Sequence, residues 1–310
     1  MTDIEKAANI IQKGGLVAFP TETVYGLGAD ATNQQACLAI FQAKGRPSNN
    51  PLIVHVASVE DACKLAYFND DAERIARLLW PGPLTLVLPR KENSLIADCV
   101  TAGLATIALR VPADPVALEL IVASKRPIAA PSANKSGKLS PTNSCHVKKN
   151  FGDKIFTLSA ATKTLYGLES TILDLSAEVP AVLRLGFFTP DTLATLLAKE
   201  VVLASKLSKI KAPGMLLKHY APKTKLRLNA TALGKGEVGL NFGDSTLNAN
   251  GSLNLSVNKN LLEAAANLYD YLHILDEFCQ ANTINTIAVA PIPKEEIGLA
   301  INDRLTRAAE

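Results

Sequence analysis

The sequence predicts an α/β fold divided into two domains, and three observations lead to this prediction. Apolar runs with the length of buried strands alternate with segments of helical spacing along the first two hundred residues. A basic segment without regular periodicity interrupts that alternation at residues 205–225. A shorter series of strands and helices follows it, and a chain of 310 residues is longer than a typical single domain.

The first domain, residues 1–204, is expected to hold a sizeable sheet. Apolar residues recur at positions 4, 7, 8 and 11, which is helical spacing, and Gly14 and Gly15 end that helix. Residues 16–19 then read as a buried strand. Further strands are expected at 52–56, 84–88, 106–111, 127–130, 155–158, 170–175 and 181–185, with helices at 33–43, 70–79, 114–123, 141–149 and 190–203.

The segment 205–225 is expected to be an interdomain linker. It holds six lysines and His219, two prolines and no acid. Apolar and aromatic residues at its centre, Tyr220 among them, predict that it packs on another part of the protein. The second domain, residues 226–310, is expected to be a small α/β unit with strands at 226–228, 238–242 and 286–290 and helices near 258–280 and 295–308.

Composition narrows the function classes. With 48% hydrophobic and 20% charged residues, no run long enough to span a membrane and no secretory signal pattern, the sequence predicts a cytoplasmic protein. Five widely separated cysteines predict free thiols, not a disulfide framework or a zinc site. Residues 1–225 carry 26 basic against 19 acidic residues and residues 226–310 carry 6 against 10, so the first part favours anionic ligands such as nucleotides.

The sharpest motif is a cationic loop with the sequence KGRPSNN at residues 44–50. Lys44 and Arg46 flank a glycine, and an apolar strand follows at once. Arginine offers a planar fork of donors and lysine a compact charge, so the pair suits a polyphosphate. The same residues also fit a solvated helix end capped by glycine. A second polar loop after an apolar run, PSANKSG at 131–137, favours the ligand-binding interpretation.

A third polar segment, PTETVYGLG at residues 20–28, follows the first predicted strand. Gly26, Gly28 and Ala31 match the dinucleotide-binding fingerprint only formally, because a polar insertion separates the first glycine from the strand and the required acid is missing. Hydroxyls and a carboxylate at a strand end instead predict a small polar pocket, with plain turn chemistry as the alternative. The sequence contains no P-loop, no metal-spaced histidine pair and no nucleophile elbow.

Other polar positions allow two interpretations each. His55 lies on an apolar strand, where a histidine is more often a satisfied core residue than a ligand. Arg110, at the end of a buried strand, either pairs with an internal acid or binds a substrate carboxylate, and Arg184 has the same ambiguity. The polar run at 169–171 either lines a site at a sheet edge or caps a helix.

Six motifs occur in an order that resembles the YrdC-like threonylcarbamoyl-AMP synthases over about residues 5–190. They are PTETVYGLG at 20–28, KGRP at 44–47, PLIVH at 51–55, WPGPLT at 80–85, PSANKSG at 131–137 and EST at 169–171. The sequence KHYAP at 218–222, with an α/β segment beyond it, resembles the long form of this family. The resemblance implies a twisted, mixed sheet with flanking helices and a small Rossmann-like C-terminal domain.

The resemblance also implies an activity, that of a nucleotidyltransferase which converts L-threonine, bicarbonate and ATP into L-threonylcarbamoyladenylate and pyrophosphate. The product would pass to a downstream transferase machinery that forms N6-threonylcarbamoyladenosine at position 37 of tRNA. Such an enzyme needs little covalent chemistry, since positioning and neutralising charge supply most of the rate effect. The implied cofactor is Mg²⁺, which would arrive with ATP and not on protein ligands.

Site residues follow from the resemblance by motif. Lys44 and Arg46 would be the catalytic cations at the phosphates. The implied ATP-binding residues are Arg46, Asn50, Thr106, Ser132, Asn134, Ser140, Arg184 and Tyr220. The implied threonine-binding residues are Thr23, His55, Arg110, Ala130 and Ser170, with Arg110 on the carboxylate. In the long form the linker would close over the site as a lid.

Two alternatives stay open. A related enzyme could transfer a carbamoyl group to another acceptor, although that activity normally belongs to a larger chain with clustered cysteines, which this sequence lacks. A non-catalytic RNA-binding module could use the basic first part, although aromatic residues are only 5% of the chain. The sequence leaves direct contact with tRNA undecided. It also departs from the family pattern at residues 160–166, where a glycine-rich stretch is expected.

Overall fold

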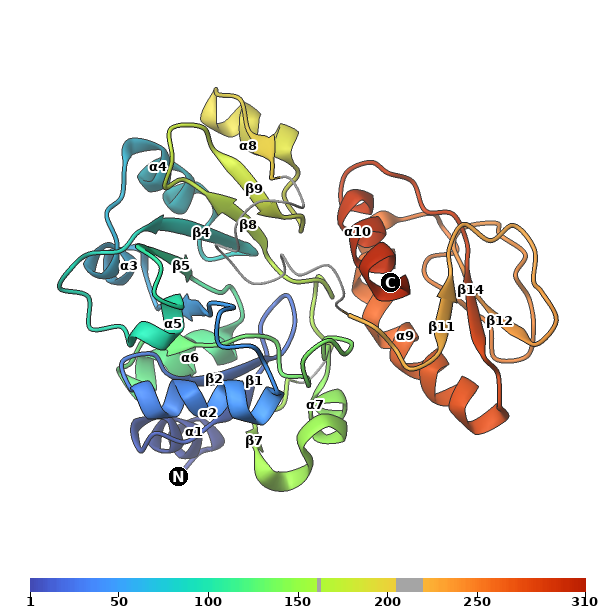
Figure 1. Cartoon of the computed structure of the whole chain (residues 1–310), viewed down its shortest axis with the longest axis horizontal. Helices are drawn as coiled ribbons and strands as arrows, with labels where there is room; N and C mark the ends of the chain where they lie inside the picture. The colour runs from blue at the N-terminus through green and yellow to red at the C-terminus, as the bar shows by residue number, and fades with distance from the viewer. Residues whose placement is uncertain (161–162, 205–219) are drawn as a thin grey trace.

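The computed structural model describes residues 1–160, 163–204 and 220–310. Figure 1 shows a larger unit built around one sheet and a smaller unit that contains the C-terminus. The large sheet takes strands up to Leu203, and the small sheet begins at Lys225. We call these units the N-terminal domain and the C-terminal domain. Among the described residues, no helix combines the length and the apolar character needed to cross a membrane.

In the described part of the N-terminal domain, ten strands form one sheet in the order β10-β9-β8-β4-β5-β3-β6-β2-β1-β7. The sheet contains both parallel pairs, such as β3 with β5, and antiparallel pairs, such as β4 with β5, so the expected mixed sheet is confirmed. The strands are β1 Val17–Phe19, β2 Gly26–Asp30, β3 Ile53–His55, β4 Leu84–Pro89, β5 Thr106–Arg110, β6 Ile128–Ala129, β7 Phe156–Thr157, β8 Thr171–Asp174, β9 Ala181–Arg184 and β10 Val202–Leu203.

Helices cover both faces of this sheet. Side chains alternate along β1, so that Val17 and Phe19 pack with α1 and α6 while Ala18 joins the core on the other face with α2 and α4. The helices are α1 Asp3–Gln12, α2 Gln34–Lys44, α3 Val59–Leu65, α4 Asp70–Leu79, α5 Asp98–Thr101, α6 Pro115–Ser124, α7 Ser144–Phe151 and α8 Pro190–Leu197, with a 3₁₀ turn η1 at Gly152–Lys154.

Five elements of the described chain were not predicted from the sequence, namely the helices α3 and α5 and the strands β2, β10 and β13 (Leu253–Asn254). The predicted helix at 190–203 ends at Leu197, and Val202–Leu203 form the edge strand β10. Strand β2 was not expected, because Gly26 and Gly28 weaken the apolar pattern of a strand. The structure explains the glycines: a Cβ on Gly28 would lie 2.7 Å from atoms of both Phe19 and Ile128, so β2 can pass between these side chains only without one.

The C-terminal domain has a parallel sheet with the order β11-β14-β12-β13 and two helices, which confirms the expected small α/β unit. Its elements are β11 Lys225–Arg227, β12 Glu237–Asn241, β13 Leu253–Asn254, α9 Leu261–Asn282, β14 Thr286–Val289 and α10 Gly298–Ala309. In Figure 1, α9 and α10 lie between the small sheet and the N-terminal domain. These helices therefore supply the side chains that cross the domain boundary.

The interface between the domains combines apolar and polar contacts. Val24 and Leu168 of the N-terminal domain belong to the same buried apolar cluster as Tyr269 of α9. The rings of His146 on α7 and His273 on α9 are stacked with their centroids 3.8 Å apart. Because buried surface of both domains is shared in this way, the position of the C-terminal domain is fixed next to the polar loops of the first domain.

Candidate active site

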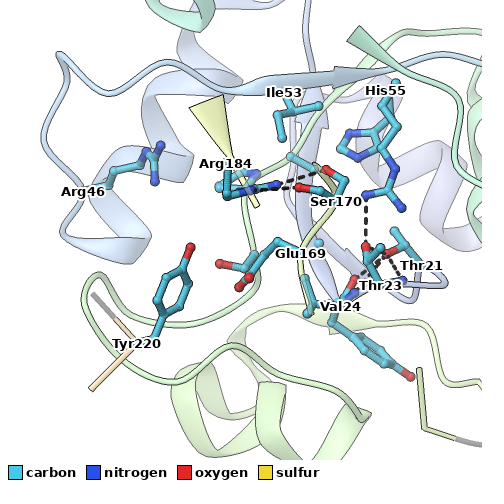
Figure 2. Close-up of a pocket in the computed structure, with 16 residues that line it drawn as sticks. Thr21, Thr23, Val24, Arg46, Ile53, His55, Glu169, Ser170, Arg184 and Tyr220 are labelled. Atoms are coloured by element: carbon cyan, nitrogen blue, oxygen red, sulfur yellow. Dashed lines mark hydrogen bonds between the residues drawn. The ribbon is translucent and has the colours of Figure 1, made fainter. Parts of the chain in front are cut away.

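The polar loops singled out in the sequence meet in one cavity, shown in Figure 2. Its charged walls come from Arg46, Arg110, Arg184 and Glu169. The predicted residues Thr23, His55, Ala130, Ser132, Ser170 and Tyr220 also line it. A cavity with three arginines and several hydroxyls and one carboxylate is suited to an anionic ligand.

Sheet register explains why distant residues converge here. β3 and β5 are parallel neighbours, and His55 is paired with Arg110 at their carboxyl ends. The segment after β6 lies beside β3, where the Ala130 amide donates to the Ile53 carbonyl at 2.9 Å. Polar residues that follow buried strands thus gather at one edge, as the ligand sites of open α/β sheets commonly do.

Arg110 is held by three neighbours, yet one of its donors makes no hydrogen bond. Its Nε donates to the Gly82 carbonyl at 3.2 Å and its Nη1 to the Thr23 hydroxyl at 3.0 Å. Its Nη2 forms an ion pair with Glu22 Oε1 at 2.7 Å, but the geometry is not that of a hydrogen bond. A buried guanidinium at a cavity wall, with an ion pair but no hydrogen bond at Nη2, is suited to bind a ligand carboxylate as well.

His55 lies beside Arg110 and is almost fully buried. Its Nδ1 has no hydrogen-bond partner, and its ring packs edge-on against Phe19 with centroids 6.1 Å apart. Burial, together with the positive charge of Arg110, lowers the pKa of His55 to about 3. The imidazole is therefore neutral at physiological pH and offers the cavity a polar atom without a charge.

The cationic loop lies at the other end of the cavity. α2 ends at Lys44 because Gly45 adopts the left-handed conformation with φ of 64°, which turns the chain toward Arg46. Arg46 donates from Nε to the Asn50 carbonyl at 3.2 Å and from Nη2 to the Pro51 carbonyl at 2.9 Å. Burial lowers the pKa of Arg46 to about 10, which still leaves it charged at neutral pH.

Lys44 is buried behind this wall and does not line the cavity itself. Its ammonium donates to the carbonyls of Ser132 and Asn134, and its own carbonyl accepts from the Ser136 amide at 2.8 Å. Burial, then the charges of Arg46 and Lys135, lower the pKa of Lys44 well below its usual range. Lys44 thus joins the two polar loops of the sequence, which a helix end exposed to solvent would not do.

Ser170 and Arg184 form a second polar unit on neighbouring antiparallel strands. Arg184 donates from Nε to the Ser170 carbonyl and from Nη2 to the Ser170 hydroxyl, each at 3.0 Å. The Ser170 hydroxyl also lies 2.7 Å from that of Thr85. These contacts fix the guanidinium of Arg184 against the cavity, and Figure 2 shows it between Arg46 and Ser170.

The remaining predicted residues lie outside the cavity wall. Asn50 and Asn134 are buried in the loops behind it, and each has a side-chain oxygen without a partner. The Ser140 hydroxyl donates to Glu169. Thr106 begins β5, at the end opposite Arg110, and a strand that advances about 3.3 Å per residue carries it away from the site. The lid prediction falls on residues 205–219, which are outside the described residues.

Sequence reasoning placed Glu22 and Glu169 in polar segments that could line a pocket, but gave neither residue a role of its own. Both acids lie in polar segments next to buried strands, and this position is the feature of the sequence that indicates a role at the site. The carboxylate of Glu169 accepts from Ser140, from the Tyr269 hydroxyl and from Arg304 Nε, the last at 2.9 Å. Two of these partners belong to the C-terminal domain, so the wall of the cavity depends on both domains.

The described residues contain no group of three or more histidine, cysteine, aspartate or glutamate side chains that could hold a metal ion. The two carboxylates at the site are each already paired with an arginine, Glu22 with Arg110 and Glu169 with Arg304. The expected cysteine chemistry is confirmed, since all five cysteines are free thiols.

Comparison with known proteins agrees with the sequence resemblance. The threonylcarbamoyl-AMP synthase of Pyrococcus abyssi is 39% identical, over 99% of this chain and 94% of its own, and that of Bacillus subtilis is 38% identical, over 99% and 92%. The crystal structure of P. abyssi Sua5 complexed with L-threonine superposes with a TM-score of 0.89 at 38% identity, covering 99% of this chain and 94% of that one.

Family models divide the chain in two. The Sua5_yciO_yrdC model, described as "Telomere recombination", matches residues 9–186. The model described as "Threonylcarbamoyl-AMP synthase, C-terminal domain" matches residues 188–310. Together with the relatives, these matches confirm the resemblance: the chain belongs to the Sua5_yciO_yrdC family, in the two-domain form that carries the threonylcarbamoyl-AMP synthase C-terminal domain.

Proposed function

We propose that the protein is an L-threonylcarbamoyladenylate synthase, which joins L-threonine, bicarbonate and ATP in the first step of N6-threonylcarbamoyladenosine formation on tRNA. One observation carries this proposal. A single cavity has the buried guanidinium of Arg110 at one end and the cationic loop around Arg46 at the other, in a chain similar along its length to threonylcarbamoyl-AMP synthases.

Threonine would bind at the Arg110 end. The guanidinium of Arg110, which is paired with Glu22 but makes no hydrogen bond from Nη2, would bind the carboxylate. The Thr23 hydroxyl and the neutral His55 would contact the remaining polar groups. Ala130 and Ser170 would complete the wall around the amino acid. A neutral histidine serves this role well, because it would not attract the phosphates of ATP away from their own site.

ATP would bind at the Arg46 end. Arg46 and Arg184 would face the phosphates. Lys44 would add positive charge from behind the cavity wall, where its ammonium holds the loop of Ser132. Ser132 and Tyr220 would contact the nucleotide from the cavity wall, and Asn50, Asn134 and Ser140 would support those loops from behind. Thr106 does not line the cavity, and its contact with ATP rests on the resemblance alone.

The reaction then needs positioning more than covalent catalysis. The threonine amine and bicarbonate give a carbamate and water, and a carbamate oxygen attacks the α-phosphorus. The bond from the α-phosphorus to the bridging oxygen breaks, and pyrophosphate leaves with that electron pair. Arg46 and Arg184 would neutralise the charge that develops on the phosphates, and a buried site would keep water from the labile carbamate.

Mg²⁺ would enter as a complex with ATP, since both carboxylates at the site are paired with arginines. It would neutralise charge on the triphosphate. We also propose that the protein acts in the cytoplasm and passes its product to a separate transferase. The linker of residues 205–225 is proposed to close over the nucleotide, with Tyr220, at its described end, already buried in the cavity wall.

The test is pyrophosphate release from Mg·ATP by purified protein, with threonine and bicarbonate omitted in turn. Release that requires both substrates is expected. Release that ignores threonine would reject the substrate assignment and keep the nucleotide site. No release under any condition, together with salt-dependent binding of RNA, would favour an RNA-binding module instead.

A further inference from the structure

Arg304, on α10 of the C-terminal domain, reaches into the active site of the other domain. It is 1% exposed, and among the described residues of the C-terminal domain it is the only buried arginine or lysine. Its Nε donates to Glu169 Oε2 at 2.9 Å, its Nη1 to Asp303 Oδ2 of its own helix at 2.7 Å and its Nη2 to the Leu185 carbonyl at 2.7 Å. Its guanidinium carbon lies 5.1 Å from the centre of the Tyr220 ring.

Glu169 is an unexpected neighbour for a phosphate group. Its carboxylate lies in the cavity between Arg184 and Tyr220, as Figure 2 shows. Burial alone would raise the pKa of Glu169, but Arg304, then Arg184 and the Ser140 hydroxyl, lower it to about 2. The carboxylate is therefore charged at neutral pH, and an unpaired negative charge here would repel a triphosphate.

Arg304 also determines which groups the guanidinium of Arg184 contacts. In the structure Arg184 donates to Ser170, although it lies close enough to Glu169 to influence its titration. Without Arg304, Arg184 would be the cation that acts most strongly on Glu169, and a buried carboxylate strongly favours such a partner. The arginine would then be drawn away from the phosphates.

We propose that Arg304 is a positioning residue of the active site, which neutralises Glu169 and so keeps Arg184 and the cavity available to ATP. It acts across the domain boundary and touches no substrate, and this role rests on the proposed function. An arginine is required because its fork binds the Glu169 carboxylate and the Leu185 carbonyl together, whereas a lysine has one compact charge.

The experiment measures the dissociation constant of Mg·ATP for wild type, Arg304→Met, Glu169→Gln and the double variant. Arg304→Met should weaken binding by about tenfold or more, within the usual range of coupling between sites. The double variant should recover most of that loss, because the charge that Arg304 neutralises is gone. Arg227→Met is the matched control: it lies on β11 of the same domain, pairs with Glu237 at 2.9 Å, does not line the cavity and should bind Mg·ATP like wild type.

Rescue by Glu169→Gln distinguishes a positioning role from structural support. If Arg304→Met merely detached the C-terminal domain, removing the charge of Glu169 as well would not restore the affinity for Mg·ATP. Equal affinity of folded Arg304→Met and wild type would overturn the proposal, and so would a double variant as weak as Arg304→Met. If Arg304→Met does not fold, Glu169→Gln alone decides: tighter Mg·ATP binding supports the role and weaker binding overturns it. Wild-type protein that bound no Mg·ATP would overturn the proposed function as well.

Discussion

The buried pair of Glu22 and Arg110 allows a quantitative test of the threonine end of the site. The two side chains are 6% and 4% exposed and lie 2.7 Å apart, and neither carboxylate oxygen of Glu22 has a hydrogen-bond partner. Glu22→Gln removes the negative charge at nearly constant shape. Arg110 would keep its bonds to Gly82 and Thr23, but its charge would be buried without an anion.

Removing one member of a buried ion pair typically costs about 3–5 kcal/mol, and the two bonds that Arg110 retains place this case near 3 kcal/mol. For a domain of this size, that loss lowers the melting temperature by about 6–12 °C. Threonine should then stabilise Glu22→Gln more than it stabilises wild type, because its carboxylate replaces the missing anion.

The assay is thermal and urea unfolding of both proteins, with and without saturating L-threonine. Glu119→Gln, on an exposed position of α6, is the control for loss of one acidic charge and should change stability by less than about 0.5 kcal/mol. A Glu22→Gln variant as stable as wild type would refute the reasoning about the pair. A variant that is destabilised but gains no more from threonine than wild type would refute the assignment of Arg110 to the carboxylate.

Three further predictions concern the loops, the interface and the backbone. Lys44→Met should fold but release pyrophosphate about 10²–10³-fold more slowly than wild type, and a folded variant with near-normal turnover would contradict this. Burial and the stacked His273 lower the pKa of His146 to about 3, although Asp270 lies 3.6 Å away. As the pH falls below about 6.5, the unfolded chain therefore binds this proton before the folded protein does, and the free energy of unfolding should decrease by about 1.4 kcal/mol per pH unit. In acid titrations, His146→Gln should remove this contribution to the slope. Gly186→Ala should lower the free energy of unfolding by about 1–3 kcal/mol and slow pyrophosphate release, because its Cβ would lie 2.4 Å from the Thr171 amide nitrogen. Unchanged unfolding and turnover would contradict this, since the strands would then have moved apart without cost.

Local pattern predicted much of this molecule. A sizeable sheet with flanking helices, the small α/β domain and the loops that carry Arg46 and Ser132 follow from segments a few residues long, whereas the mixed character of the sheet came from the family resemblance. β2 was missed because its glycines are required by Phe19 on the neighbouring strand, which is tertiary information. Thr106 begins its strand and does not line the cavity, so its contact with ATP stays a prediction from the resemblance.

Contacts between the domains were the hardest to foresee. Glu169 and Arg304 are 135 residues apart, and neither motif nor spacing connects them. A signal was nevertheless present at Arg304. It occupies the apolar face of α10 with Ile301 and Leu305, where an arginine is out of place unless a buried anion receives it.

The same separation of 135 residues has a consequence for folding. A contact between such distant positions closes a long loop, so it is expected to form after the local structure of the N-terminal domain. The single tryptophan, Trp80, lies in the core of that domain and can report its refolding. On dilution from urea, tryptophan fluorescence should recover first, and the capacity to bind Mg·ATP should appear in a later phase; simultaneous recovery would contradict this order. The protein would then pass through a state with a native fold in its larger domain and an incomplete active site.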